Sequence, residues 1–378
     1  MILSLCACSD GAAQAKNEKP AIDETPIQDR IAGWVEQIHA DFQLIESPSI
    51  NDIAAYCNVM TLTGHTDRIE PAIDKAPIDK QDNLYNGVAR TLIYIGEDDQ
   101  ARAMLRGDDP ATLRRAVNGA QWRCFEVADH ARIVDIAERF EIDQARYTGA
   151  TSAAMLRQWE RAAKLLESAD NPERVARTEE SISLLKLVET PDQPMPTLDK
   201  STGGPSLVAM LFAVMGEPER AFQALEQSSE DEQFRGQIQV VMALDGIGQK
   251  EKAQKLWAEI EINLPPPGDD HTLMATIAQC AGRLGHVEIA SAYQPVESEQ
   301  IATRTKCLAA AGMMDEAFKL FQQDPKNSVA ARITGETVYH GAYDQIDRLV
   351  ATDTPKNRFI MLSMLVDDAV KLKVLQSR

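Results

Sequence analysis

The chain has 378 residues, of which 44% are hydrophobic and 5% aromatic, with a formal net charge of −19 and a pI of about 4.8. Because binding to a phosphate backbone requires clustered Lys and Arg, this balance disfavours nucleic acid as a partner. The acidity is interpreted as the solubility of an extended surface, with an acidic docking patch as the alternative. The length would suffice for several domains, but only helical periodicity is present.

Residues 1–30 are predicted to be a signal-like segment followed by a flexible tether. Leu5 and Ala7 precede Cys8 at positions −3 and −1, and the chain then becomes small, polar and proline-containing. This resembles a bacterial lipoprotein signal, which implies export, a lipid on Cys8 and, with Ser9 next, a periplasmic protein held at the outer membrane. Only seven residues precede Cys8 and none is basic, so a disordered tail of a cytoplasmic protein is the alternative.

A glycine followed five residues later by a small or β-branched residue recurs along most of the chain. The first and last of these glycines are about 280 residues apart, which nine units of about 31 residues would fill. Apolar residues around each glycine fall at helical spacing, so each unit is predicted to be two helices joined by a tight turn, with the glycine left-handed where the first helix ends. The pairs are Gly64/Ile69, Gly96/Ala101, Gly216/Ala221, Gly248/Ala253, Gly285/Ala290, Gly312/Ala317 and Gly341/Ile346.

Residues at other fixed distances from each turn position also repeat along the chain, and we call each such set a column. Two units have Ala128 and Arg157 at the turn position in place of glycine, and a degenerate unit is placed around 181–189, which makes about ten hairpins. Small residues are expected where two helices cross closely: Ala101, Ala162, Ala221, Ala253, Ala290 and Ala317 five after the turn, and Cys57, Ala89, Ala209, Val241, Ala278 and Thr305 seven before it. Core side chains are expected one turn further along the second helix, at Ile73, Leu105, Leu166, Leu225, Trp257, Phe321 and Val350.

Columns such as Gly216, Ala221 and Leu225, or Gly312, Ala317 and Phe321, resemble the tetratricopeptide repeat family over roughly residues 45–375. The resemblance implies an all-α fold, a right-handed α-solenoid of about ten degenerate helix-turn-helix repeats. It also implies a concave face lined by the first helix of each unit, and partner binding more often than catalysis. Related helical-hairpin solenoids are the alternative.

The predicted array has two parts, residues 31–187 and 206–378, joined by residues 188–205. That joint contains four prolines and two glycines, which interrupt helices. A second interruption is expected at 263–270, and the last helix, beginning at Arg358, is expected to cap the array.

No motif for catalysis, a cofactor or a metal is present, so no catalytic residue, metal ligand or cofactor is predicted. The segment 268–272, which holds two aspartates beside His271, is interpreted as a solvated loop rather than a metal fragment. Cys57, Cys124, Cys280 and Cys307 lack zinc spacing and are interpreted as buried thiols. Cys280 and Cys307 share a register on adjacent helices, which leaves a disulfide open.

Residues six and ten before the turn are expected to face a groove: Asn58, Asn86, Arg90, Asn118, Trp122 and Tyr147 in the amino-terminal part. An asparagine can pair with a peptide backbone, and in the resembled family asparagines at this column often hold peptide main chain. Trp and Arg are typical binding hot spots. In the carboxy-terminal part the columns are mostly apolar: Met210, Ile238, Met242, Ala275, Ala302 and Lys306. The alternative is that these residues are simply tolerated on an exposed or half-buried helix face, or that they form hydrogen bonds within the array.

The resulting hypothesis is a non-catalytic scaffold or adaptor for a protein or peptide partner, exported and touching a membrane only through a lipid anchor. The alternatives are an accessory or degenerate enzyme with an unrecognised site, and a cytoplasmic solenoid scaffold.

Overall fold

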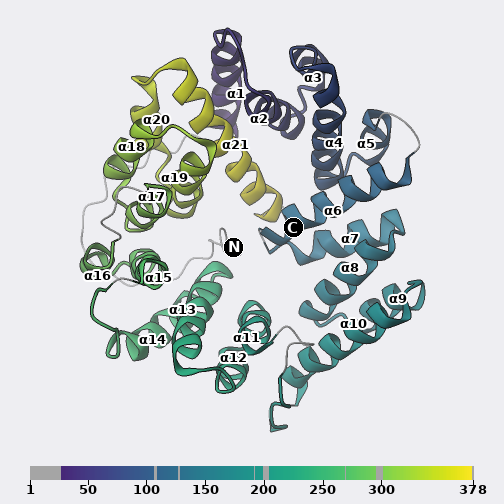
Figure 1. The fold of residues 1–378 in the computed structure, drawn as a ribbon, viewed down its shortest axis with the longest axis vertical. Helices are drawn as coiled ribbons and strands as arrows, with labels where there is room; N and C mark the ends of the chain where they lie inside the picture. The colour runs from purple at the N-terminus through teal and green to yellow at the C-terminus, as the bar shows by residue number, and fades with distance from the viewer. Residues whose placement is uncertain are drawn as a thin grey trace. The chain divides into compact units, whose positions relative to one another are not determined.

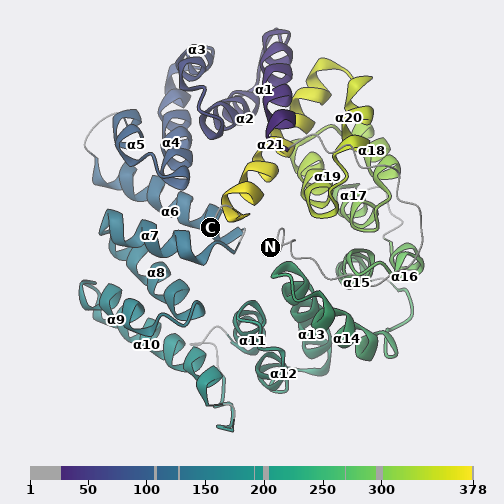
Figure 2. The same ribbon diagram turned by 180° about the vertical axis from the view of Figure 1, so that it is seen from behind.

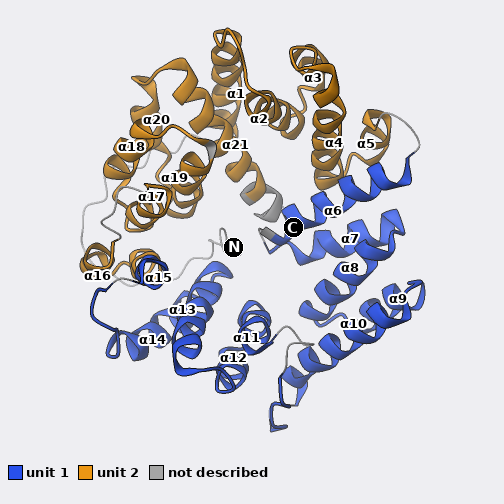
Figure 3. Cartoon of the chain, in the orientation of Figure 1, with its two compact units in different colours: residues 1–6, 109–276 blue, residues 7–108, 277–378 orange. Residues whose placement is uncertain are grey.

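The computed structural model describes residues 27–105, 109–126, 128–190, 192–198, 204–268, 270–294 and 301–376 (Figure 1). Throughout these residues the regular secondary structure is helical, which confirms the predicted all-α class. The chain forms two compact units, coloured separately in Figure 3. In the described chain, unit 1 comprises residues 109–276, and unit 2 combines residues up to 108 with residues 277 onward.

Unit 1 is built from consecutive helices. They are α6 (Pro110–Glu126), α7 (His130–Phe140), α8 (Asp143–Met155), α9 (Trp159–Glu167), α10 (Pro172–Leu185), the short 3-10 helix Lys186–Glu189, α11 (Gly204–Val214), α12 (Pro218–Leu225), α13 (Glu230–Gly246) and α14 (Lys250–Glu261). Helix α15 (His271–Arg283) begins in unit 1 and ends in unit 2.

Unit 2 has two stretches of chain. The first contains α1 (Ile27–Gln43), α2 (Ile50–Leu62), the 3-10 helix Thr66–Arg68, α3 (Ile69–Ile73), α4 (Ile78–Ile95) and α5 (Asp98–Met104). The second contains α16 (Val287–Ala292), α17 (Ile301–Ala310), α18 (Met314–Gln323), α19 (Asn327–His340), α20 (Tyr343–Ala351) and α21 (Pro355–Gln376).

The turn positions predicted from the glycine pattern are left-handed. Each of the seven glycines named above has a positive φ, between 66° and 97°. Ala128 and Arg157, which stand at turn positions without a glycine, also have positive φ values of 55° and 59°. Glu141 takes the same conformation where α7 ends, which the glycine pattern did not predict.

The small-residue columns are buried as expected. The six alanines five residues after the turns are fully buried, and so is Trp257 among the predicted core side chains. A larger side chain at such a crossing would force the helices apart. The four cysteines Cys57, Cys124, Cys280 and Cys307 are buried free thiols, which confirms the interpretation as thiols and leaves Cys280 and Cys307 unbridged.

The proline-rich segment 188–205 lies inside unit 1, and its described part is held by Arg220 of α12 and by Gln227, which follows that helix. Arg220 is buried and donates to the carbonyl oxygens of Leu187 at 3.0 Å and Gln193 at 2.7 Å. Gln227 accepts from the backbone N–H of Leu198 at 2.7 Å and donates to the carbonyl of Pro196 at 2.8 Å. The described residues of this segment that lie outside helices thus satisfy part of their backbone hydrogen bonding through side chains.

Helix α21 packs against α1, α2, α19 and α20, so the first and last helices of the described chain meet within unit 2 (Figures 1 and 2). Its residues Phe359, Ile360, Met361 and Leu362 are all buried. Four consecutive buried apolar residues cover every side of a helix, and a helix that is apolar all round needs neighbours on several sides. The expected cap is therefore itself covered by α1 and α2.

Polar contacts fix this arrangement. Arg358 of α21 donates from Nε to Oδ2 of Asp41 at 2.7 Å and from Nη2 to Oδ1 at 2.5 Å, and Asp41 is fully buried. Arg30 of α1 pairs with Asp344 and Asp347 of α20 at 2.5 and 2.7 Å. Beside them the Phe42 ring stacks on Tyr56 with centroids 4.1 Å apart.

Replacing Arg358 with Met is expected to lower the free energy of unfolding by about 3 to 5 kcal/mol, because it leaves the Asp41 carboxylate buried without its partner. Chemical denaturation checks this value. The matched control is Arg177→Met, which removes an exposed pair with Glu173 and is expected to cost about 0.5 kcal/mol or less. Equal small losses in both variants would contradict a structural role for the Asp41 pair.

Candidate partner-binding face on α6

Three side chains of α6 form one stripe on its surface. Asn118, Trp122 and Phe125 are spaced by four and three residues, so they lie on the same face of the helix. Trp122 is 54% exposed, and its ring stacks against the half-buried Phe125 ring with centroids 6.2 Å apart and an interplanar angle of 21°. Asn118 is half-buried, and its Oδ1 atom is buried without a hydrogen-bond donor. We call these three residues the α6 stripe.

The α6 stripe rests on aromatic and polar contacts beneath it. The Phe125 ring meets the His130 ring edge to face, with centroids 5.9 Å apart. His130, at the start of α7, is buried and lies 3.3 Å from the hydroxyl of Ser152 in α8 through its Nδ1 atom. Because both side chains are buried, the His130–Ser152 pair supports the packing and lies out of reach of a substrate in this structure.

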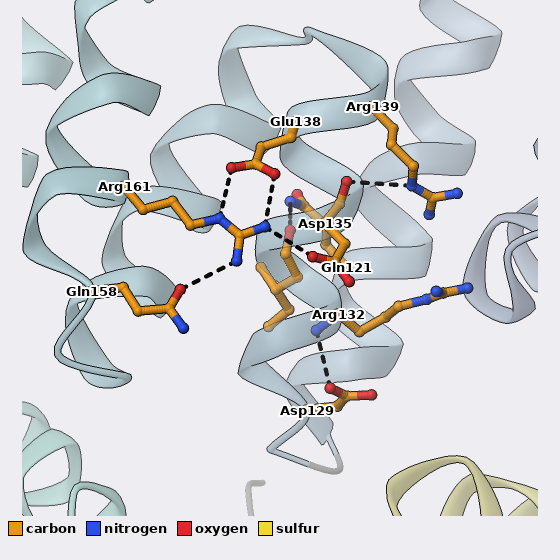
Figure 4. Close-up of polar contacts among 9 residues, drawn as sticks. Gln121, Asp129, Arg132, Asp135, Glu138, Arg139, Gln158 and Arg161 are labelled. Atoms are coloured by element: carbon orange, nitrogen blue, oxygen red, sulfur yellow. Dashed lines mark hydrogen bonds and ion pairs between the residues drawn. The ribbon is translucent and has the colours of Figure 1, made fainter. Parts of the chain in front are cut away.

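A buried glutamine links α6 to the two helices behind it. Gln121, labelled in Figure 4, donates from its Nε2 atom to the carbonyl of Ile133 in α7 at 3.2 Å. It also donates to the carbonyl of Ala145 in α8 at 3.0 Å. Buried polar groups that are fully bonded hold neighbouring elements in one arrangement. The orientation of α6, and with it the position of the α6 stripe, is therefore held by the residue that directly precedes Trp122.

The outer side of α7 carries an ion-pair cluster centred on Arg161 of α9. Arg161 donates to both carboxylate oxygens of Glu138 at 2.7 Å and to Asp135 at 2.9 Å, and it also contacts Gln158 (Figure 4). These hydrogen bonds, above all those that Arg161 donates to Glu138, raise the pKa of Arg161 and lower the pKa of Glu138. The cluster is largely exposed, so it orients α9 on α7 more than it stabilises the fold.

The other predicted groove residues have different surroundings. Asn58 is half-buried and bonded within unit 2, donating to Asp367 at 2.9 Å and accepting from the Thr91 hydroxyl at 2.9 Å. Tyr147 is 7% exposed, and its hydroxyl accepts from the backbone N–H of Asn171 at 3.2 Å. These contacts give Asn58 and Tyr147 structural roles, while any part of theirs in a groove stays a prediction.

Asn86 and Arg90 lie one turn apart on α4 of unit 2, where Asn86 is half-buried and Arg90 is exposed. Asn118 and Trp122, by contrast, belong to unit 1. In the carboxy-terminal columns, Ile238 and Met242 are buried. Cys8 lies outside the described residues.

Phe125, Gln121 and His130 are residues of this site that the groove columns missed. Phe125 had a detectable signal, because an aromatic residue three positions after an exposed tryptophan lies on the same helix face. Gln121 and His130 had none, since their roles depend on contacts with α7 and α8 that no local pattern encodes.

No family model and no curated protein matches the chain. Among the described residues, no group of three or more His, Cys, Asp or Glu side chains is placed to hold a metal ion. The helices in the described part of the chain also include none with the length and apolar character needed to cross a bilayer.

The buried His130 is expected to make unit 1 sensitive to acid. Burial lowers the pKa of His130 from 6.5 to about 4. Between these two pH values the unfolded chain binds a proton that the folded chain does not, so stability is complete above pH 6.5 and falls as the pH drops. The loss should reach about 3 kcal/mol by pH 4.

Comparing the native chain with His130→Gln in denaturant titrations at several pH values isolates this effect, since the acidic residues titrate in both proteins. The native chain is expected to lose stability more steeply between pH 6.5 and 4. Parallel pH profiles would show that His130 is not held neutral by burial.

Proposed function

We propose that this chain is a non-catalytic scaffold or adaptor that binds a protein or peptide partner, and that the α6 stripe is one of its contacts. The observation that carries the proposal is a buried, unbonded acceptor, Oδ1 of Asn118, one helical turn from the exposed ring of Trp122. Leaving a buried acceptor unbonded costs free energy that an incoming donor would recover. A partially exposed tryptophan offers apolar area that an apolar group of the partner would cover.

The chemistry of the α6 stripe fits an extended peptide segment. A main-chain N–H of such a segment would donate to Asn118 Oδ1, and a neighbouring apolar side chain would lie on the stacked rings of Trp122 and Phe125. Because Gln121 and His130 already hold α6 in place, binding would require little reorganisation of the helix.

The proposed scaffold is a right-handed α-solenoid of about ten degenerate helical hairpins, similar to the tetratricopeptide repeat family. Supporting it are the left-handed turns at the predicted positions and the fully buried alanines five residues after them. In such an array each hairpin contacts its neighbours and leaves first-helix side chains available to a partner.

Truncating Asn118 and Trp122 together to Ala is expected to weaken partner capture by more than about 2 kcal/mol, which is roughly thirtyfold in affinity, because both would act at a buried contact. Partners are first identified by cross-linking to the native chain, and their affinities are then measured with purified proteins. The melting midpoint should change little, since Trp122 is exposed.

Leu207→Ala is the matched control, because Leu207 is another large exposed apolar residue of unit 1. A second double variant, Asn86→Ala with Arg90→Ala, tests the predicted groove residues on α4. Unchanged affinity in the Asn118 and Trp122 variant would remove the α6 stripe as a binding site.

We also propose that the protein is exported and anchored by a lipid on Cys8, with the outer membrane as its address. The support is the sequence Leu-Cys-Ala-Cys-Ser at positions 5–9. Cys8→Ser is expected to move the protein from the membrane fraction to the soluble fraction of a bacterial host, because the acyl chains would be its anchor. Cys6→Ser is the matched control and should stay with membranes; the same distribution for both variants would contradict the anchor.

A further inference from the structure

The face of α6 that carries the α6 stripe extends toward the start of the helix as a basic surface. Arg114 lies four residues before Asn118 and eight before Trp122, so these three side chains follow one line along the helix. Arg115 lies three residues before Asn118, on the same side of α6. Both arginines are exposed, as Trp122 is. One helix face therefore has a cationic end and an aromatic end.

The two arginines differ in their surroundings. Arg115 donates from Nη2 to the hydroxyl of Thr112 at 3.0 Å, and that hydroxyl donates to the Asp109 carboxylate at 2.8 Å. Asp109 therefore offsets part of the Arg115 charge. The Arg114 side chain forms no hydrogen bond or ion pair with the described residues. Its guanidinium, which carries five N–H donors, is available to an acceptor on a partner.

The acidic side chains of α7 and α8, the helices that pack against α6, already have partners. In α7, Asp135 and Glu138 both accept from Arg161 of α9. In α8, Asp143 pairs with Arg146 at 3.2 Å. The chain as a whole carries a charge of −19, but charges beyond about 10 Å are largely screened at ordinary ionic strength. The basic end of the α6 face thus keeps its local positive charge.

We propose that the partner segment bound at the α6 stripe is an acidic extended peptide, in which a side-chain carboxylate contacts Arg114 and an apolar side chain covers the Trp122 ring. This inference rests on the proposed function and adds the chemical class of the partner. A guanidinium can donate two parallel hydrogen bonds to one carboxylate, and such charge-assisted bonds are stronger than bonds to neutral acceptors. A nucleic acid would require a larger cluster of Lys and Arg than Arg114 and Arg115 provide.

The helix sets the spacing of the two groups in the peptide. At a rise of about 1.5 Å per residue, Arg114 and Trp122 are about 12 Å apart along α6, with Asn118 midway between them. An extended chain rises about 3.3 Å per residue and its side chains alternate in direction, so residues four apart lie about 13 Å apart on one face. The expected motif is an Asp or Glu and a large apolar residue four positions apart. A main-chain N–H between them would donate to the buried Oδ1 of Asn118.

The experiment begins with selection of a random peptide-display library on the purified full chain. Peptides that also bind the double variant Asn118→Ala with Trp122→Ala are removed, so the remaining peptides depend on the α6 stripe. These are expected to carry Asp or Glu four positions from a large apolar residue. The tightest binder is then synthesised in two forms, one with its acidic residue and one with the corresponding amide, and the affinities are measured by fluorescence anisotropy.

Arg114→Gln is expected to weaken the acidic peptide about tenfold and to leave the amide form almost unchanged, because a hydrogen bond to a charged group contributes about that much. The matched control is Lys255→Gln, which removes one positive charge from an exposed position on α14, outside the α6 face. It is expected to change the affinity less than about twofold. Added salt should weaken binding of the acidic peptide to the native chain more than to the Arg114→Gln variant.

Two results separate this inference from the proposed function. Peptides that depend on Asn118 and Trp122 but lack an acidic residue would overturn the acidic partner and keep the α6 stripe as a binding site. So would an acidic peptide that binds the Arg114→Gln variant as tightly as the native chain. A selection that yields no peptide dependent on Asn118 and Trp122 would overturn both this inference and the peptide site proposed on α6.

Discussion

The Asp41–Arg358 pair is the interaction on which unit 2 depends most directly. It joins residues 317 positions apart, and one partner is a fully buried carboxylate. Taking a carboxylate out of water is costly unless it is paired and hydrogen-bonded. The bidentate hydrogen bonds from Arg358 therefore offset the cost of burying Asp41. An apolar pair of the same shape could contribute as much stability. The ion pair adds a requirement that α21 meet α1 at one register.

That constraint works together with the apolar surface around it. Helix α21 buries Phe359 against Phe42, whose ring in turn stacks on Tyr56 of α2. The aromatic contacts bury apolar surface but restrict the relative position of the helices only loosely. The charge-assisted hydrogen bonds of Arg358 and Arg30 restrict that position more closely, because they require a particular geometry. Together they bring two stretches of chain, separated by the whole of unit 1, into one compact body.

The local part of this fold was predictable from the sequence because turns and close crossings demand particular residues. A left-handed turn favours glycine, and a crossing of two backbones favours alanine, so both leave a visible pattern. The pairing of α1 with α21 left no pattern in the sequence, because it depends on two segments that meet only after folding. For the same reason the register placed Asn118 and Trp122 on one face, but it could not tell that Asn58 and Tyr147 are the residues bonded within the protein, to Asp367 and to the backbone of Asn171.

A second arginine–carboxylate pair in unit 2 follows the same rule. Arg283 and Glu336 are only 1% and 2% exposed, and they match one guanidinium to one carboxylate, as Arg358 and Asp41 do. A buried charge is tolerated when a charged, hydrogen-bonded partner lies next to it. The chain as a whole carries a charge of −19, yet charges beyond about 10 Å are largely screened at ordinary ionic strength. The buried carboxylates of unit 2 are therefore stabilised by their own arginine partners, whatever the overall acidity of the chain.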